Sequence, residues 1–273
     1  MLNNDLRRRL TNPVSTISNV HIWTLFRASM DGYMLCRLEH LLTPEELSKA
    51  NRYLRPADRL RFIVSRGMLR VLLAQYLEME PGDIAILTGK NGKPHVQRQG
   101  EGTRIGFNVS HSRNGIVYAF IEEGEIGIDV EDVSQLPDLD KIIPYVFSDQ
   151  EMLEFKSLPE DMKVDAFFTC WTRKEAYIKA RGVGLGIPLQ QINTSFLSAS
   201  PQLICDSTAE GDDALWYVNN IFTFPGYCMA VAVNQRFSHF DYYYWPQDRA
   251  FLKDVLDYRE GLREKAMPRE AMI

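Results

Sequence analysis

The order strand, helices, strands is predicted twice along this chain, and it restricts the possible folds more than any other feature of the sequence. In the first pass, an alternating segment at 19–26 precedes helical segments at 43–54 and 56–77. Short strands joined by a turn at Asn114-Gly115 follow. The second pass begins after Gly124, and its predicted elements are a strand from 125, helices at about 138–157 and 161–181, and strands near 191–197, 215–222 and 227–234.

This order predicts an α+β fold with two similar halves related by a pseudo-twofold axis, each half a small antiparallel sheet packed with helices. The expected boundaries are 19–124 for the N-terminal half and 125–240 for the C-terminal half. Residues 1–18 are then an N-terminal extension. Residues 241–273 are a C-terminal extension whose apolar spacing predicts an amphipathic helix. No residue-level repeat accompanies the predicted halves.

Composition narrows the class of protein. The chain has 273 residues and a formal net charge of −5, which argues against a general nucleic-acid-binding protein. No apolar run approaches the ~20 residues of a membrane span, and no apolar segment follows the basic N-terminus as in a secretory signal. The four cysteines are too widely spaced for a zinc site. We expect a soluble, cytoplasmic protein without a nucleic-acid or membrane partner.

Two carboxylates share one face of the strand IGIDVED. Alternation places Ile126, Ile128 and Val130 on one side and Gly127, Asp129 and Glu131 on the other, so the two acids lie ~7 Å apart. A divalent cation can lie between such groups, and magnesium favours their hard oxygen atoms. A solvent-facing edge strand is the alternative explanation, because alternating acids are common there.

A third carboxylate, Glu175, falls within an apolar helical stripe that includes Phe168, Trp171 and Ile178. A buried carboxylate is costly unless a cation or a metal ion compensates it. A metal shared with Asp129 and Glu131 would account for all three acids. An ion pair with Lys179 at i, i+4 is the structural alternative.

Several other residues could bind phosphate. Ser110 and His111 end the strand FNVSHS, where they fit donors to phosphate oxygens better than a nucleophilic pair, because adjacent strand residues point to opposite faces. Lys93 lies in a glycine-punctuated turn, GKP, and an arginine-rich stretch runs from 52 to 70. Surface lysines and a solvated helix face explain these equally well. The glycines of RGVGLG follow a helix and are therefore predicted to end it rather than to bind a dinucleotide.

Together these segments resemble the 4′-phosphopantetheinyl transferases, specifically the surfactin-synthetase-activating type in which one chain contains both halves. The resemblance is carried by five segments in the family's order: GKP (92–94), FNVSHS (107–112), GIDVE (127–131), FSDQE (147–151) and WTRKEAYIKARGVGL (171–185). It implies transfer of phosphopantetheine from coenzyme A to a serine of an apo acyl or peptidyl carrier protein by a monomer. A non-catalytic module that binds a carrier protein or a nucleotide is the alternative.

The resemblance also implies roles for individual residues. The magnesium ligands would be Asp129, Glu131 and Glu175. Glu175, acting directly or through a metal-bound water, is the first candidate for the base that removes the serine proton, and Glu151 is the second. The residues expected to contact the phosphates of coenzyme A are Arg61, Lys93, Ser110, His111, Lys174 and Lys179, the last two at the pyrophosphate, where Lys179 would also stabilise charge during the reaction.

Overall fold

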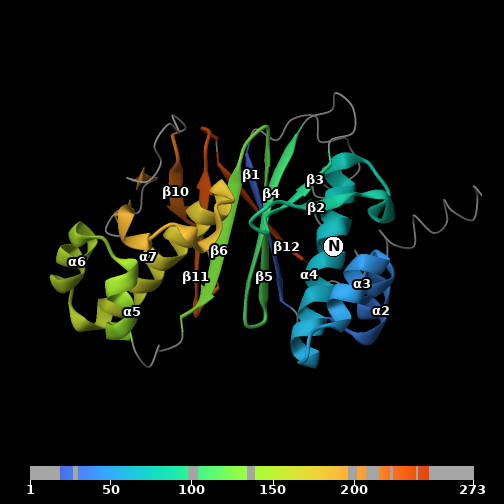
Figure 1. Cartoon of the computed structure of the whole chain (residues 1–273), viewed down its shortest axis with the longest axis horizontal. Helices are drawn as coiled ribbons and strands as arrows, with labels where there is room; N and C mark the ends of the chain where they lie inside the picture. The colour runs from blue at the N-terminus through green and yellow to red at the C-terminus, as the bar shows by residue number, and fades with distance from the viewer. Residues whose placement is uncertain are drawn as a thin grey trace, which may run out of the picture.

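The computed structural model of the chain describes residues 19–26, 30–97, 104–133, 139–195, 202–206, 215–221, 224–237 and 239–245. Within these residues, two four-stranded sheets face each other, and helices cover the outer side of each (Figure 1). The molecule therefore has four layers, and the predicted α+β class is confirmed. The expected extensions at 1–18 and beyond 245 lie outside the described residues.

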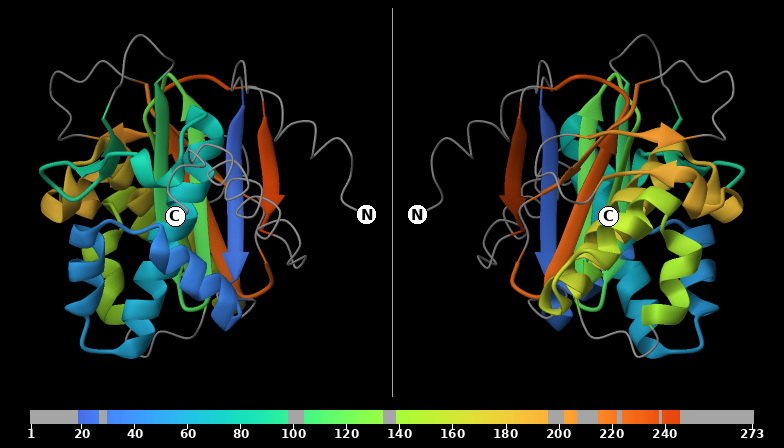
Figure 2. Two further views of the ribbon diagram at one scale, coloured as in Figure 1. Left: turned by 90° about the vertical axis from the view of Figure 1, so that its right-hand side faces the viewer. Right: turned by 90° about the vertical axis from the view of Figure 1, so that its left-hand side faces the viewer.

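The first sheet contains β1 (Val20–Phe26), β4 (Ile105–Ser112), β5 (Gly115–Glu122) and β12 (Phe240–Tyr244). Its strand order is β12-β1-β5-β4. β5 pairs antiparallel with both β1 and β4, and β12 joins β1 in parallel. Figure 2 shows β12 at the edge of this sheet.

The second sheet contains β6 (Ile126–Asp132), β8 (Gln202–Leu203), β10 (Tyr217–Asn220) and β11 (Tyr227–Val233). Its order is β6-β11-β10-β8, and all its neighbours are antiparallel. Two short hairpin-like sheets accompany the large ones: β2 (Ile86–Thr88) with β3 (Pro94–Val96), and β7 (Ile192–Asn193) with β9 (Cys205–Asp206).

Three helices cover each large sheet (Figure 1). On the first sheet they are α2 (Gly32–His40), α3 (Pro44–Asn51) and α4 (Pro56–Leu77), and on the second α5 (Leu139–Val146), α6 (Asp149–Lys156) and α7 (Glu160–Arg181). Single 3-10 turns η2 (Pro81–Asp83), η3 (Gly184–Gly186) and η4 (Leu189–Gln191) connect elements. In the part of the chain that the structure describes, no helix is long and apolar enough to cross a membrane.

Helices α3 and α6 begin in the same way. Thr43 and Ser148 each close a capping box with a glutamate three residues later, Glu46 and Glu151. Each glutamate also accepts from a cation of the long helix that follows it: Glu46 from Arg70 of α4 and Glu151 from Lys174 of α7. The two cations hold the same position counted from the start of their 22-residue helices. The predicted helix at 138–157 is thus two helices, because Ser148 starts a new one.

Side chains of β4 join the two sheets at the edge where β4 meets β6. The Asn108 carbonyl oxygen accepts from the Ile128 backbone N–H at 3.0 Å, and the Ser112 hydroxyl accepts from the Asp132 N–H at 3.1 Å. These bonds satisfy N–H groups of β6 that no strand pairs on that side. The alternation of β4 therefore points a polar row at the second sheet.

The C-terminal part of the described chain departs from the expected boundary at 240. Phe240–Tyr244 form β12 rather than the start of a helical extension, and this strand follows the second sheet in sequence but belongs to the first. Trp245, 5% exposed, and Tyr243 pack against Trp23 of β1. Tyr243 and Trp245 are therefore part of the core of the first sheet and its helices.

Gly127 allows α7 to lie unusually close to β6. A Cβ atom at this position would lie 2.0 Å from the Ala176 carbonyl oxygen and 2.4 Å from the Ala180 nitrogen. Both are backbone atoms of a long helix, so neither can move alone. We expect Gly127→Ala to lower the free energy of unfolding by at least the ~1–3 kcal/mol typical of overpacking. Urea denaturation measures this. Gly186→Ala, where a Cβ meets nothing within 4 Å, should cost little. Equal stability of the two variants would contradict the prediction.

Candidate active site

The three carboxylates lie on facing elements, β6 and α7. Ile128 and Val130 are buried in the core between the sheets, whereas Asp129 and Glu131 face α7, as the alternation predicted. On α7, the residues Trp171, Glu175 and Lys179 follow at intervals of four and share one helix face. The close approach at Gly127 brings this helix face to the acids.

Asp129 is 2% exposed and is held by two donors. Its Oδ1 accepts from Lys179 Nζ at 2.5 Å and from Ser110 Oγ at 3.0 Å. Its Oδ2 is buried and has no partner among the described residues. Burial raises the pKa of Asp129, and the positive charge of Lys179 offsets part of that rise. Lys179 therefore forms its ion pair across to β6, which differs from the Glu175–Lys179 pair considered as the structural alternative.

Glu131 has a donor on each oxygen. Ser112 Oγ donates to Oε2 at 3.0 Å, and Trp171 Nε1 donates to Oε1 at 3.3 Å. Burial and the neighbouring charge of Asp129 raise the pKa of Glu131, and the two hydrogen bonds lower it in part. This carboxylate is consequently the most firmly oriented of the three.

Glu175 has the least compensation. Its Oε1 is buried and has no partner among the described residues. Burial raises the pKa of Glu175, and the negative charges of Asp129 and Glu131 raise it further, whereas Lys179 lowers it. The three carboxylates thus repel one another in partly desolvated surroundings.

These residues fit a divalent cation by their chemistry. All supply hard oxygen ligands, two of them have a buried oxygen without a partner, and a dication would neutralise their repulsion. Among the described residues, no group of three or more His, Cys, Asp or Glu side chains is already gathered closely around one cation position. Lys179 lies against Asp129 instead and supplies the positive charge there.

A positively charged group borders the carboxylates. His111 is exposed at the end of β4, while Ser110 beside it is buried and bonded to Asp129. Partial burial lowers the pKa of His111, and the positive charges of Arg61 and Lys179 lower it further. Arg61 of α4 forms an ion pair with Asp58 at 2.8 Å, and its charge also acts on His111. The structure therefore brings two of the predicted phosphate-binding residues, Ser110 and Lys179, together at Asp129, and His111 is adjacent to Ser110 on β4.

Lys93 lies elsewhere, against the C-terminal end of α7. Its Nζ donates to Glu125 Oε2 at 2.7 Å and to the Ala180 carbonyl oxygen at 2.6 Å. Burial lowers its pKa, and Glu125 offsets this. Gly182 ends the helix in the left-handed conformation, as predicted for RGVGLG. The predicted phosphate contact of Lys93 therefore competes with an ion pair and a helix-end contact.

Lys174 and Glu151 form a closed pair away from the carboxylate group. Both side chains are 0% exposed, and Lys174 Nζ donates to Glu151 Oε2 at 2.5 Å and to the carbonyl oxygens of Val146 and Leu189. All three ammonium hydrogens are thus in use. Glu151 also caps α6 and accepts from the Thr194 N–H. The structure brings neither residue to the site, which corrects the expectation of a phosphate contact and a second base.

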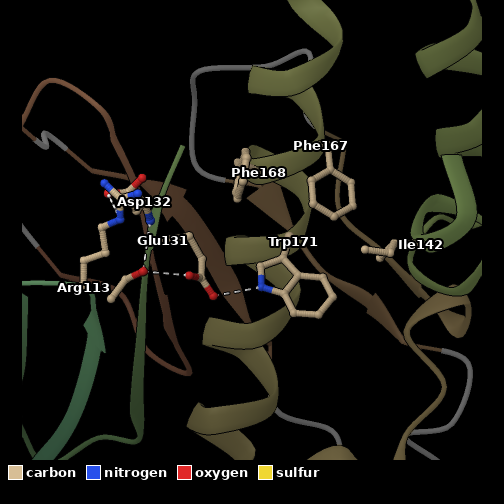
Figure 3. Close-up of a pocket in the computed structure, with 8 residues that line it drawn as sticks. Arg113, Glu131, Asp132, Ile142, Phe167, Phe168 and Trp171 are labelled. Atoms are coloured by element: carbon tan, nitrogen blue, oxygen red, sulfur yellow. Dashed lines mark hydrogen bonds and ion pairs between the residues drawn. The ribbon is translucent and has the colours of Figure 1, made fainter. Parts of the chain in front are cut away.

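A cavity of about 320 Å³ adjoins Glu131 (Figure 3). One wall is apolar and the other is polar, and the lining residues are Ser112, Arg113, Glu131, Asp132, Ile142, Phe167, Phe168 and Trp171. Figure 3 shows Glu131 between the turn after β4 and the Trp171 indole. A pocket of this volume falls at the lower end of the range for small-molecule sites.

Ser112 is not among the predicted site residues, although it follows Ser110 by two residues on the same strand. That spacing places both hydroxyls on one face and could have indicated it. Trp171 was assigned to the apolar stripe, and its bond to Glu131 was not foreseen. A tryptophan N–H that packs against a polar strand needs an acceptor. Glu131 is far from Trp171 in sequence, so no local pattern indicates that it is this acceptor.

Comparison with known proteins gives the same answer for both halves. The profile described as the 4′-phosphopantetheinyl transferase superfamily matches residues 125–232, and that described as 4′-phosphopantetheinyl transferase, N-terminal, matches residues 30–122. The chain is 35% identical over 182 residues to 4′-phosphopantetheinyl transferase HetI of Nostoc sp., covering 67% of this chain and 76% of that protein. It is 34% identical to putative 4′-phosphopantetheinyl transferase slr0495 of Synechocystis sp., covering 66% and 72%.

4′-phosphopantetheinyl transferase Sfp of Bacillus subtilis is similar as well, with 27% identity over 195 residues, 71% of this chain and 83% of that protein. The family matches and the names of these relatives indicate a group-transfer enzyme, and the acids and the lysine between β6 and α7 fit the handling of phosphates. The chain belongs to the 4′-phosphopantetheinyl transferase family, as its sequence resemblance indicated. The non-catalytic alternative is not favoured.

Proposed function

We propose that this protein transfers the 4′-phosphopantetheine group of coenzyme A to a serine hydroxyl of an apo carrier protein and releases 3′,5′-ADP. The observation that supports this most directly is the partly buried acid group of Asp129, Glu131 and Glu175 next to the Lys179 ammonium. The acids suit a cation, and the ammonium suits a pyrophosphate.

The residues that would hold the cation are Asp129, Glu131 and Glu175, and the ion proposed is magnesium. When bound, magnesium would neutralise negative charge on the pyrophosphate and on the leaving nucleotide. Lys179, which now pairs with Asp129, can donate to phosphate oxygens from the same position. Arg61, Ser110 and His111 would hold the remaining phosphate oxygens.

The transfer needs a base for the serine proton. In the step, the serine oxygen bonds to the phosphorus that carries the pantetheine arm, the bond from that phosphorus to the nucleotide oxygen breaks, and the proton leaves the hydroxyl. Glu175 is the base we propose, because it lies on the face of α7 that meets the other two acids and one of its oxygens is buried without a partner among the described residues. Glu151 does not qualify, since Lys174 and Thr194 already occupy its oxygens.

The cavity beside Glu131 is proposed to receive the pantetheine arm. The apolar wall of Ile142, Phe167, Phe168 and Trp171 suits the methyl and methylene groups of the arm. The polar wall, which includes Ser112 and Arg113, can bond to its amides.

The two halves are proposed to be related by a pseudo-twofold axis. Strands β1-β5-β4 and β6-β11-β10 have the same order and directions, and each half has a 22-residue helix whose cation pairs with a capping-box glutamate. In this arrangement the half at 19–124 contacts the phosphates of coenzyme A, and the half at 125–240 carries the acids. We further propose a cytoplasmic monomer.

Binding of the nucleotide should be linked to protonation of His111. The lowered pKa keeps this side chain neutral in the free protein near pH 7, and a bound phosphate would raise its pKa again. The affinity for 3′,5′-ADP should therefore rise as pH falls from 8 to 6, with uptake of up to about one proton. Calorimetry in two buffers of different ionisation enthalpy counts the protons. His111→Gln should remove this uptake, and an unchanged count would exclude His111 from the phosphate site.

The experiment that tests the function is intact-mass analysis of apo carrier proteins from fatty acid, polyketide and peptide synthesis. Each is incubated with coenzyme A, magnesium and this protein. We expect one phosphopantetheine per carrier and none without coenzyme A or with the acceptor serine replaced by alanine. Binding of a carrier without any mass increase would favour the non-catalytic alternative instead.

A further inference from the structure

Glu131 differs from the two other acids in how it is held. Each of its oxygens has a donor, and the donors come from different halves: Ser112 from β4 and Trp171 from α7. Asp129 and Glu175 each keep a buried oxygen without a partner among the described residues. The orientation of Glu131 is therefore set before any ligand arrives.

The geometry fixes the direction of the Ser112 hydroxyl. Ser112 Oγ lies 3.1 Å from the Asp132 backbone nitrogen, which can only donate, and 3.0 Å from Glu131 Oε2, which accepts when ionised. A serine hydroxyl has a single hydrogen, so that hydrogen must point at the carboxylate. The backbone bond thus holds the hydroxyl in the position that orients Glu131.

The turn after Ser112 strengthens this hold. Arg113, in the left-handed region with φ 49°, places its Nε 3.3 Å from Asp132 Oδ2. The β4–β5 hairpin of the first half consequently contacts both the backbone and a side chain at the end of β6 (Figure 3). Residues of the β4–β5 hairpin therefore fix the position of the end of β6.

We infer that Ser112 is a positioning residue that acts through Glu131 and makes the metal site of one half depend on a hydroxyl of the other. The inference rests on the proposed function, in which Glu131 is a metal ligand. Removing the hydroxyl would leave the Asp132 N–H without its acceptor and Glu131 with one donor. Groups that orient a metal ligand typically contribute about 10–100-fold to metal affinity.

The test is a titration of the full chain with Mn²⁺, followed by electron paramagnetic resonance without coenzyme A, alongside thermal melting. We expect Ser112→Ala to weaken Mn²⁺ binding by about 10-fold or more. Ser112→Thr, which keeps the hydroxyl, should restore affinity to within a few-fold of wild type. Ser157→Ala is the matched control, because the Ser157 hydroxyl donates to the Glu154 carbonyl oxygen at the end of α6 and, among the bonds of the described residues, to no acid.

Asn108→Ala separates positioning from a structural role. It removes a bond across the same edge, to the Ile128 N–H, without touching an acid. If Ser112→Ala weakens Mn²⁺ binding and Asn108→Ala changes only the melting temperature, the inference holds. If both variants weaken binding alike, or Ser112→Ala binds as wild type does, it is overturned. Failure of the proposed function would appear in the wild-type protein itself, as no Mn²⁺ binding and no transfer.

Discussion

Glu175→Gln is expected to abolish transfer and at the same time to raise the melting temperature of the metal-free protein. The amide keeps the volume of the side chain but loses the charge that a metal and a serine proton need, so turnover should fall by at least the 10²–10⁴-fold of a lost general base. The carboxylate of Glu175 has a raised pKa, caused first by burial and then by Asp129.

Because the pKa of Glu175 is raised, its ionised form destabilises the metal-free fold. When a carboxyl group has a higher pKa in the folded than in the unfolded protein, the protein loses stability as pH rises through the interval between the two pKa values. At neutral pH, the ionised Glu175 therefore destabilises the metal-free fold, and glutamine removes this cost. Each kcal/mol regained corresponds to roughly 2–4 °C for a chain of this size.

Calorimetric melting at pH 7, without and with magnesium, measures both effects. Glu160→Gln, whose side chain is 88% exposed at the start of the same helix, serves as the control and should change neither property. Magnesium should stabilise the wild type and not Glu175→Gln. Normal turnover of Glu175→Gln would show that the residue is neither a metal ligand nor the base.

Lys174→Met is expected to destabilise the protein by about 3–5 kcal/mol, which is the usual cost of leaving one member of a buried ion pair uncompensated. Glu151 is fully buried, and without Lys174 its remaining partners are the N–H groups of Ser148 and Thr194 with the Thr194 hydroxyl. Urea unfolding gives the free energy. Transfer assayed at low temperature on the folded fraction should stay within a few-fold of wild type, since Lys174 does not reach the site.

The double variant Glu151→Gln, Lys174→Met distinguishes charge from packing. Glutamine retains the capping geometry but not the charge, so this variant should recover part of the loss. A stable Lys174→Met protein that has lost transfer would restore the sequence-based role of Lys174 at the pyrophosphate and contradict the structural assignment.

Local sequence patterns predicted helices and strands correctly where burial of one face in the core determines the pattern. The strand at 19–26 and the helix at 56–77 appear as β1 and α4, and the alternation in β6 correctly separated its acids from its apolar residues. The helix α2 was missed, although Gly32–His40 is amphipathic, because so short a segment depends on packing against α4 for its stability.

The sequence distinguished site residues from structural residues less well, because the neighbours Lys174 and Glu175 were both assigned to the site. Lys174 and Glu175 are ~100° apart around the helix, so only one of them can share the face of Trp171 and Lys179. Helical period alone could have removed Lys174. By contrast, the partners of Lys93 and of Glu131 come from segments far away in sequence, and no local pattern indicates such contacts.

The parallel strand β12 has a consequence for how this protein can be shortened. The matched family profile ends at residue 232, and a chain cut there would lack Phe240–Tyr244 and Trp245. Strand β1 would then be a bare edge with Trp23 uncovered, which is a template for aggregation or for exchange of strands between copies. Because β12 follows the second sheet but pairs with the first, it also connects the two sheets on the side away from β4 and β6. A hinged separation of the two sheets would first have to break the pairing between β12 and β1.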